Sequence, residues 1–166
     1  PQAFSLIRYA GLFSQYPHSA CGLEIMLKDV FSPTMISVIQ CVHRKVLIAP
    51  EQLPLLGEGG SRLGMDSLLG EEMTDRMWKF RIQAGPLDIE NYHDFLPGSD
   101  GYRRLAFLTG IYLNDPFDSD IELILAEGEI STARVGDDKM SRLGCDTWLY
   151  AGDEWGEVRE VFPLQR

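Results

Sequence analysis

The sequence predicts an α+β fold, in which small mixed or antiparallel sheets pack against helices. Segments with one apolar face at helical spacing occur in both halves of the chain, and alternating segments lie between them. The predicted order is helix, strand, strand, loop, strand, helix pair, strand, which lacks the regular alternation of a doubly wound sheet. The strand, helix pair and strand of the second half form a candidate ferredoxin-like unit.

Helices are predicted where apolar residues recur every three or four positions behind a residue that caps helix N-termini. The spacing predicts a short helix over residues 5–14 and a second helix that begins after Ser19. In the second half, Asp88 begins one helix, and Ser99 or Asp100 begins a longer one.

Strands are predicted where apolar and polar residues alternate and β-branched or aromatic residues are frequent. This pattern covers residues 34–42, continues over residues 46–49, and returns over residues 78–83 and 121–125. We expect Gly85 and the proline after it to end the third of these strands.

A loop rich in glycine and proline, centred on residues 57–61, divides the chain. We expect a helix-helix-strand lobe over residues 1–56, a strand-helix-strand lobe over residues 57–152 and an acidic, apolar tail over residues 153–166. The chain does not begin with methionine, so we expect it to be a piece of a longer protein.

The composition argues against several classes of protein. The net charge of −10, from 25 acidic and 15 basic residues, argues against a nucleic-acid partner. We expect no direct membrane insertion, because no apolar run approaches the about 20 residues that span a bilayer. An odd number of cysteines favours free thiols in the cytoplasm over a disulfide framework. These cysteines are Cys21, Cys41 and Cys145.

The motifs of catalysis are incomplete. Cys41 and His43 share one face of a strand, but no further cysteine or histidine completes a zinc site at a suitable spacing. The glycine-rich residues 57–64 lack the lysine and hydroxyl ending of a phosphate-binding loop. The acidic doublets match no calcium loop. We therefore expect no catalytic residue, metal or cofactor.

Surfaces for protein partners are predicted in the tail and in the loop. The tail combines apolar side chains with acidic ones, and either docks on a neighbouring chain or packs back on its own domain. If it docks, deletion of residues 152–166 should leave the domain folded. The candidate partner-binding residues are Trp155, Val158, Val161, Phe162, Leu55 and Leu56.

A five-residue pattern occurs twice, as Arg62-Leu63-Gly64-Met65-Asp66 and as Arg142-Leu143-Gly144-Cys145-Asp146. It indicates either a duplication or two similar turns. The arginines beside turn glycines, Arg62, Arg81 and Arg142, are candidates to bind carboxylates within the fold or on a partner.

Short blocks in a fixed order resemble the C-terminal half of the TssG family, also called ImpH or VasB, of the type VI secretion baseplate. The blocks cover residues 9–13, 18–20, 22–23, 63–70, 80–87, 95–98 and 142–149. The chain departs from the family pattern at Cys145, where an aromatic is expected, and at Lys45-Val46, where the usual tryptophan is absent.

The resemblance implies a scaffold that joins two copies of a TssF-type subunit and contacts TssK-type trimers. It also implies a cytoplasmic protein, assembled at the inner face of the membrane, with no catalytic residue or cofactor. From the residues alone, two alternatives stay open: an α+β peptide- or protein-binding module of another assembly, or a small hydrolase.

Overall fold

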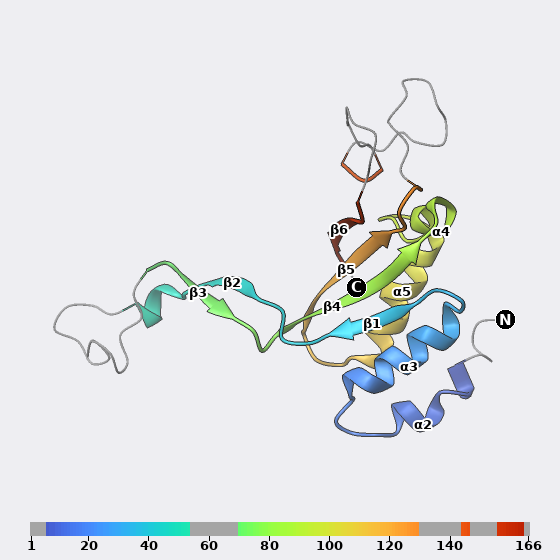
Figure 1. The fold of residues 1–166 in the computed structure, drawn as a ribbon. Helices are drawn as coiled ribbons and strands as arrows, with labels where there is room; N and C mark the ends of the chain where they lie inside the picture. Colours follow the sequence, from blue (N-terminus) through green and yellow to red (C-terminus); the bar gives the residue numbers. More distant parts are fainter. Residues whose placement is uncertain (1–5, 54–69, 130–143, 147–155, 165–166) are drawn as a thin grey trace. The chain divides into compact units, whose positions relative to one another are not determined.

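The computed structural model describes residues 6–53, 70–129, 144–146 and 156–164, which belong to two compact units (Figure 1). Unit 1 comprises Pro1–Gln40 and Phe80–Arg166, and unit 2 comprises Cys41–Lys79. Helices, a four-stranded sheet and a two-stranded sheet confirm the α+β class. The units do not follow the segments expected from the sequence, because strands from both sides of the central loop pair in one sheet.

Three helices of unit 1 begin at the capping residues that the sequence predicts, whereas α2 begins after Tyr9 without a side-chain cap. Their bounds are Ala10–Phe13 for α2, Ala20–Val30 for α3, Ile89–Asp94 for α4 and Asp100–Tyr112 for α5. The Ser19 hydroxyl accepts the Gly22 amide at 3.0 Å, and the side chains of Asp88 and Ser99 cap α4 and α5 in the same way. Within the described residues, no helix is both long and apolar enough to cross a bilayer.

The sheet of unit 1 is mixed, with strand order β1-β4-β5-β6. The strands are Ile36–Ile39 (β1), Lys79–Leu87 (β4), Asp118–Leu125 (β5) and Val158–Pro163 (β6). β1 and β4 are antiparallel, as are β5 and β6. β4 and β5 run parallel (Figure 1), because Gln83 faces Glu122 and Leu87 faces Ala126, so the paired residue numbers rise together.

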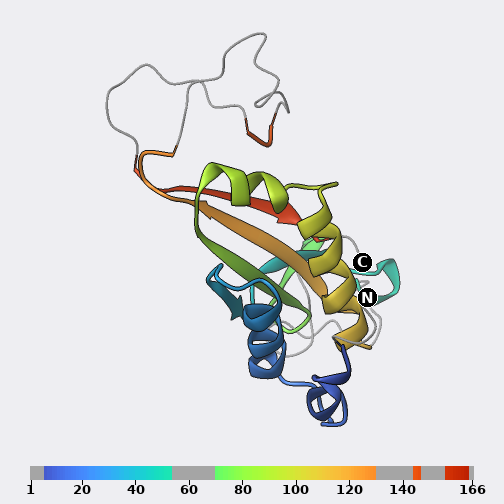
Figure 2. The ribbon, with the colours of Figure 1, turned by 90° about the vertical axis from the view of Figure 1, so that its right-hand side faces the viewer.

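The helix pair α4–α5 connects these two parallel strands. β4 and β5 are neighbours in the sheet, whereas a ferredoxin-like split unit would place another strand between them. α3 packs against β1 and α5, and α4 packs against β5 and α5. Figure 2 shows α4 and α5 as separate helices that meet at an angle.

The expectation that β4 ends at Gly85 is wrong, because the strand continues to Leu87. Gly85 keeps its place in the sheet through an amide bond to the Met35 carbonyl at 3.0 Å. Its φ of +145° suits glycine, and a Cβ atom there would lie 2.6 Å from the Cβ atom of Ile124. Glycine at this position therefore allows close strand pairing rather than ending the strand.

The segment expected to be a tail supplies the edge strand β6. Phe162 and Leu164 belong to the core cluster, and Val158 packs against it. Packing back on the domain was one of the two alternatives for this segment. Because residues 152–166 include core side chains, we now expect their deletion to destabilise unit 1.

One face of the sheet carries the core. Alternate residues of β4 and β5 point to this face, and the buried residues of α3, α4 and α5 meet them there. The most deeply buried side chains of the cluster include Leu27, Ile82, Tyr92, Leu105, Ile121 and Leu123.

Unit 2 contains an antiparallel ladder of β2, Arg44–Leu47, and β3, Glu72–Asp75, with a short 3₁₀ turn, η1, at Pro50–Gln52. β2 was expected over residues 46–49, and β3 was not expected. Among the described residues of this unit, only Ile48 is a buried hydrophobic residue.

Candidate protein-interaction surfaces

The structure places three of the predicted partner-binding residues on β6. Phe162 is 8% exposed and Val158 is half-buried, so both contribute to the core face. Val161 is 41% exposed and lies on the opposite face of the sheet. The other three predicted residues, Trp155, Leu55 and Leu56, lie outside the described residues.

The sheet face opposite the core carries a charged cluster. The Arg81 guanidinium lies 3.4 Å from the Asp120 carboxylate and 3.5 Å from the Glu122 carboxylate. The Gln83 amide donates to Glu122 at 2.7 Å and accepts from the Ser37 hydroxyl at 3.2 Å. The cluster thus links β1, β4 and β5, and Arg81 binds carboxylates within the fold.

Unit 2 exposes large apolar side chains. Leu47 and Met77 are 74% and 79% exposed, and Met73 and Trp78 are also exposed. The ladder itself is held by an ion pair between Arg44 and Asp75 at 2.6 Å. Since a two-stranded ladder buries little of its own apolar surface, the side chains of Leu47, Met73 and Met77 are accessible to a partner.

The Asp75 carboxylate of unit 2 organises the start of the next turn. The Met77 amide donates to it at 2.8 Å, and this bond, followed by the Arg44 guanidinium, lowers the pKa of Asp75. The carboxylate is therefore a charged structural anchor rather than a proton donor near neutral pH.

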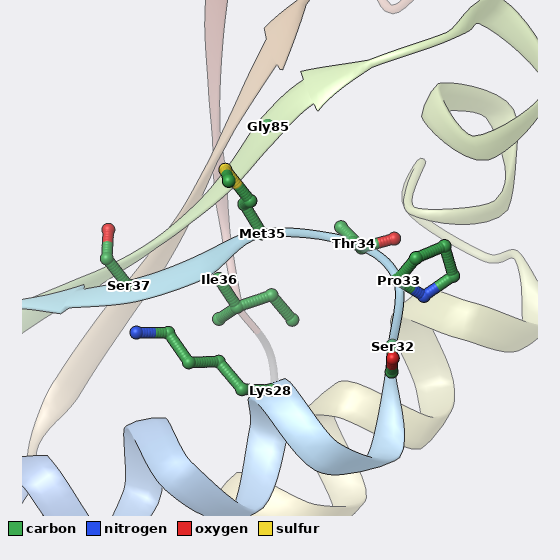
Figure 3. Close-up of a pocket in the computed structure, with 8 residues that line it drawn as sticks. All are labelled: Lys28, Ser32, Pro33, Thr34, Met35, Ile36, Ser37 and Gly85. Atoms are coloured by element: carbon green, nitrogen blue, oxygen red, sulfur yellow. The ribbon is translucent and has the colours of Figure 1, made fainter.

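A pocket of about 500 Å³ lies where α3 is followed by β1 (Figure 3). Lys28 extends along β1 below Ser37, while Met35 points to the other side of the strand, near Gly85. The Lys28 ammonium is paired with Glu24 at 2.6 Å. The residues that line the pocket include no histidine, cysteine or carboxylate, so they form no acid–base or metal-binding set.

The residues considered as metal ligands are dispersed. Cys41 is exposed in a turn with a φ of +58°, and the His43 ring contacts the Arg76 guanidinium. His18 stacks on Tyr112 with ring centroids 4.7 Å apart, which joins the start of α3 to the end of α5. Within the part of the chain that the structure describes, no three His, Cys, Asp or Glu side chains form a metal-binding group.

A tether between α4 and residues 144–146 was not predicted from the sequence. The Tyr92 hydroxyl donates to the Cys145 carbonyl at 2.9 Å. His93 Nε2 lies 3.5 Å from the carboxylate of Asp146, which is 4% exposed. The only signal for this tether was that Asp146 ends the repeated five-residue pattern, and that pattern does not identify α4 as its partner.

These features define an α+β interaction module with an exposed apolar ladder and an edge strand at the end of its main sheet. The chain belongs to the TssG family: the family model described as "Type VI secretion, TssG" matches residues 1–150. None of the curated proteins compared with the chain matches it.

Solved structures share the fold. A chain of the type VI secretion system TssK-TssF-TssG baseplate subcomplex, determined by cryo-electron microscopy, aligns with a TM-score of 0.74 at 17% identity, over 99% of this chain and 68% of that chain. A chain of the baseplate complex from the type VI secretion system aligns with a TM-score of 0.59 at 18% identity, over 94% of this chain and 45% of that one.

Proposed function

We propose that this chain is a structural, non-catalytic subunit of a type VI secretion baseplate. The family match over residues 1–150 is the observation that carries the proposal. The proposal is also supported by the name of a solved complex, a TssK-TssF-TssG baseplate subcomplex, one chain of which shares this fold. The proposal extends to the partners: two copies of a TssF-type subunit, and TssK-type trimers, in the cytoplasm at the inner face of the membrane.

Unit 2 is the first docking surface of the proposal. Burying one large apolar side chain contributes about 1.5–3 kcal/mol, so covering the exposed leucine and methionines would contribute free energy to binding. A partner that covers Leu47 and Met77 would also stabilise a ladder that is marginal by itself.

The repeated five-residue pattern is the second element of the proposal. A subunit that contacts two copies of the same partner can do so through two similar segments, and residues 62–66 and 142–146 are five-residue segments of matching pattern. Asp146 is buried against α4, so the arginine of each segment is the better candidate for the partner contact. Charge reversal at Arg62 and at Arg142 should each weaken the same interaction.

Co-purification tests the proposal. The chain is co-expressed with TssF-type and TssK-type subunits of one secretion system, and the complex is isolated through a tag on the TssK-type subunit. We expect Leu47→Glu to reduce the amount of recovered chain at least about tenfold, because the variant would place a charge where the partner buries an apolar side chain in the complex. The matched control is Ile7→Glu, a similarly exposed apolar position in unit 1.

Failure to recover a complex with the unaltered chain would contradict the assembly role. An equal loss with both variants would remove unit 2 as the specific contact. Turnover of ester or phosphoester substrates by the purified chain, abolished by a single substitution, would contradict the non-catalytic role.

A further inference from the structure

The two edge strands of the main sheet, β1 and β6, differ in whether their outward backbone amides and carbonyls form hydrogen bonds. In an antiparallel pair, alternate residues bond to the neighbouring strand and the residues between them face outward. The Leu164 amide donates to the Ser119 carbonyl at 2.8 Å, which fixes this alternation for β6. The backbone amides and carbonyls of Glu160 and Phe162 therefore bond to β5, while those of Arg159 and Val161 point away from β5, toward the open edge.

The outward groups of β6 form a short open edge. Among the described residues, none bonds to the outward amides or carbonyls of Arg159 and Val161, and both residues are exposed. The next outward position is Pro163, which has no amide proton, and its carbonyl accepts the Tyr102 hydroxyl at 2.7 Å. The edge is thus open over these two residues and closed after them.

β1, the opposite edge, is partly closed by a side chain. The outward amide of Val38 donates to the Glu24 carboxylate at 2.9 Å. Lys28, one turn further along α3, pairs with the same carboxylate. A strand added to β1 would have to displace this carboxylate from the amide. At Arg159 and Val161 of β6, by contrast, an added strand would displace no group that belongs to the described residues.

Glu160 gives the open edge a chemical preference. Its side chain is half-buried on the core face of β6, and it forms no ion pair with the residues that the structure describes. It lies near Tyr92, where burial first and then the Glu160 charge raise the pKa of the tyrosine hydroxyl. A half-buried carboxylate without a cation favours a partner that supplies one.

We infer that a partner subunit adds an extended strand to the open edge of β6, and that this strand places a lysine or arginine beside Glu160. The backbone of Arg159 and Val161 supplies the hydrogen bonds, and the exposed Val161 side chain extends the contact. The inference rests on the proposed function, and it identifies β6 as a docking site distinct from the ladder of unit 2.

Residue-resolved amide exchange tests the added strand directly. The chain is compared alone and in complex with the TssF-type and TssK-type subunits. We expect the amides of Arg159 and Val161 to exchange rapidly in the free chain and at least about tenfold more slowly in the complex. The amides of Glu160 and Phe162, which bond to β5, are the internal control and should be protected in both states.

The outcomes separate the two proposals. A complex that forms without slowing the Arg159 and Val161 amides overturns the strand addition and leaves the proposed function in place. A chain that forms no complex overturns the proposed function, and the strand addition with it. Slowing confined to these two amides on β6 supports both.

Substitutions on β6 test the same contact by affinity. Val161→Pro removes an outward amide without removing a bond to β5, and should weaken binding about three- to tenfold, as expected for one backbone hydrogen bond. Val161→Thr keeps the amide and should stay within about twofold of the unaltered chain. Equal affinity of the proline and threonine variants, with both folded, would contradict the backbone contact.

The basic residue is tested at Glu160. Glu160→Gln keeps the shape of the side chain, should weaken binding about threefold or more and should reduce its salt dependence. Unchanged affinity and unchanged salt dependence would overturn the cation on the partner strand. If Val161→Pro does not fold, Glu160→Gln and the amide-exchange measurement still test whether a partner strand adds to β6.

Discussion

Replacing Phe162 by alanine distinguishes a core strand from a detachable tail. The Phe162 side chain belongs to the core cluster, faces Ile121 across the ladder and is nearly inaccessible to solvent. The neighbouring Val161 lies on the other face and is exposed. The matched pair Phe162→Ala and Val161→Ala therefore compares core packing with surface exposure on the same strand.

The expected magnitudes are well separated. Truncating a buried phenylalanine to alanine costs about 3–5 kcal/mol, from lost transfer free energy and from the cavity that remains. Truncating an exposed valine costs about 0.5 kcal/mol or less. Domains of this size are stable by about 5–15 kcal/mol, so Phe162→Ala should remove a large share of that stability and lower the melting temperature by roughly 10 °C.

Urea unfolding followed by circular dichroism measures the difference. We expect the free energy of unfolding of Phe162→Ala to fall at least about 2 kcal/mol below that of Val161→Ala, with an unchanged dependence on urea. If the two variants unfold within about 0.5 kcal/mol of each other, Phe162 does not pack in the core. The segment would then be a separate tail, and the docking alternative for it would regain its basis.

Three further changes test other parts of the fold. Gly85→Ala should destabilise unit 1 by about 2 kcal/mol or more in urea, because its Cβ atom would meet Ile124, whereas Gly98→Ala has no such contact and should cost less; equal costs would contradict the close approach. The pKa of Glu24 is lowered first by the Lys28 ammonium and then by the Val38 amide. The ionised carboxylate therefore stabilises the fold above its unfolded pKa of about 4.3, and this contribution is lost as the pH falls through the lower pKa of the folded state. Stability measured from pH 7 to pH 3 should therefore show Glu24→Gln less stable than the unaltered chain at pH 7 and equal to it at the acid end; a constant difference would count against the ion pair. Tyr92→Phe removes the hydroxyl that caps a carbonyl of residues 144–146 and should lower the free energy of unfolding by about 1–2 kcal/mol, and a neutral effect in thermal unfolding would show that water replaces the bond.

The parts of the fold that depend on local signals were predictable from the sequence. The capping side chains at Ser19, Asp88 and Ser99 mark helix starts because each bonds an amide only a few residues away. The end of β4 was not predictable in the same way. Gly85 carries a local signal for a strand end, but the neighbouring β5 approaches so closely that glycine is needed inside the strand.

The candidate site was predictable only in part. Val158, Val161 and Phe162 were grouped from the sequence as candidate partner-binding residues, and a strand with a period of two divides them between the two faces of the sheet. The sequence could not identify β5 as their pairing partner, because the two segments lie far apart in the chain. The contact between Glu24 and the Val38 amide was missed for the same reason, since nothing in the sequence aligns α3 with the edge of β1.

The difference between the two edges explains how such a sheet can accept one partner without pairing at random. An open edge favours association with any extended chain, and proteins limit this hazard with short edges, charges and proline. β6 combines these devices: Pro163 ends the open stretch, and Glu160 and Arg159 place charges along it. A random apolar strand would bury the Glu160 carboxylate without a cation, at a cost that cancels the few hydrogen bonds gained. A strand with a basic residue at the matching position avoids this cost, so the same carboxylate that disfavours nonspecific pairing would select the partner.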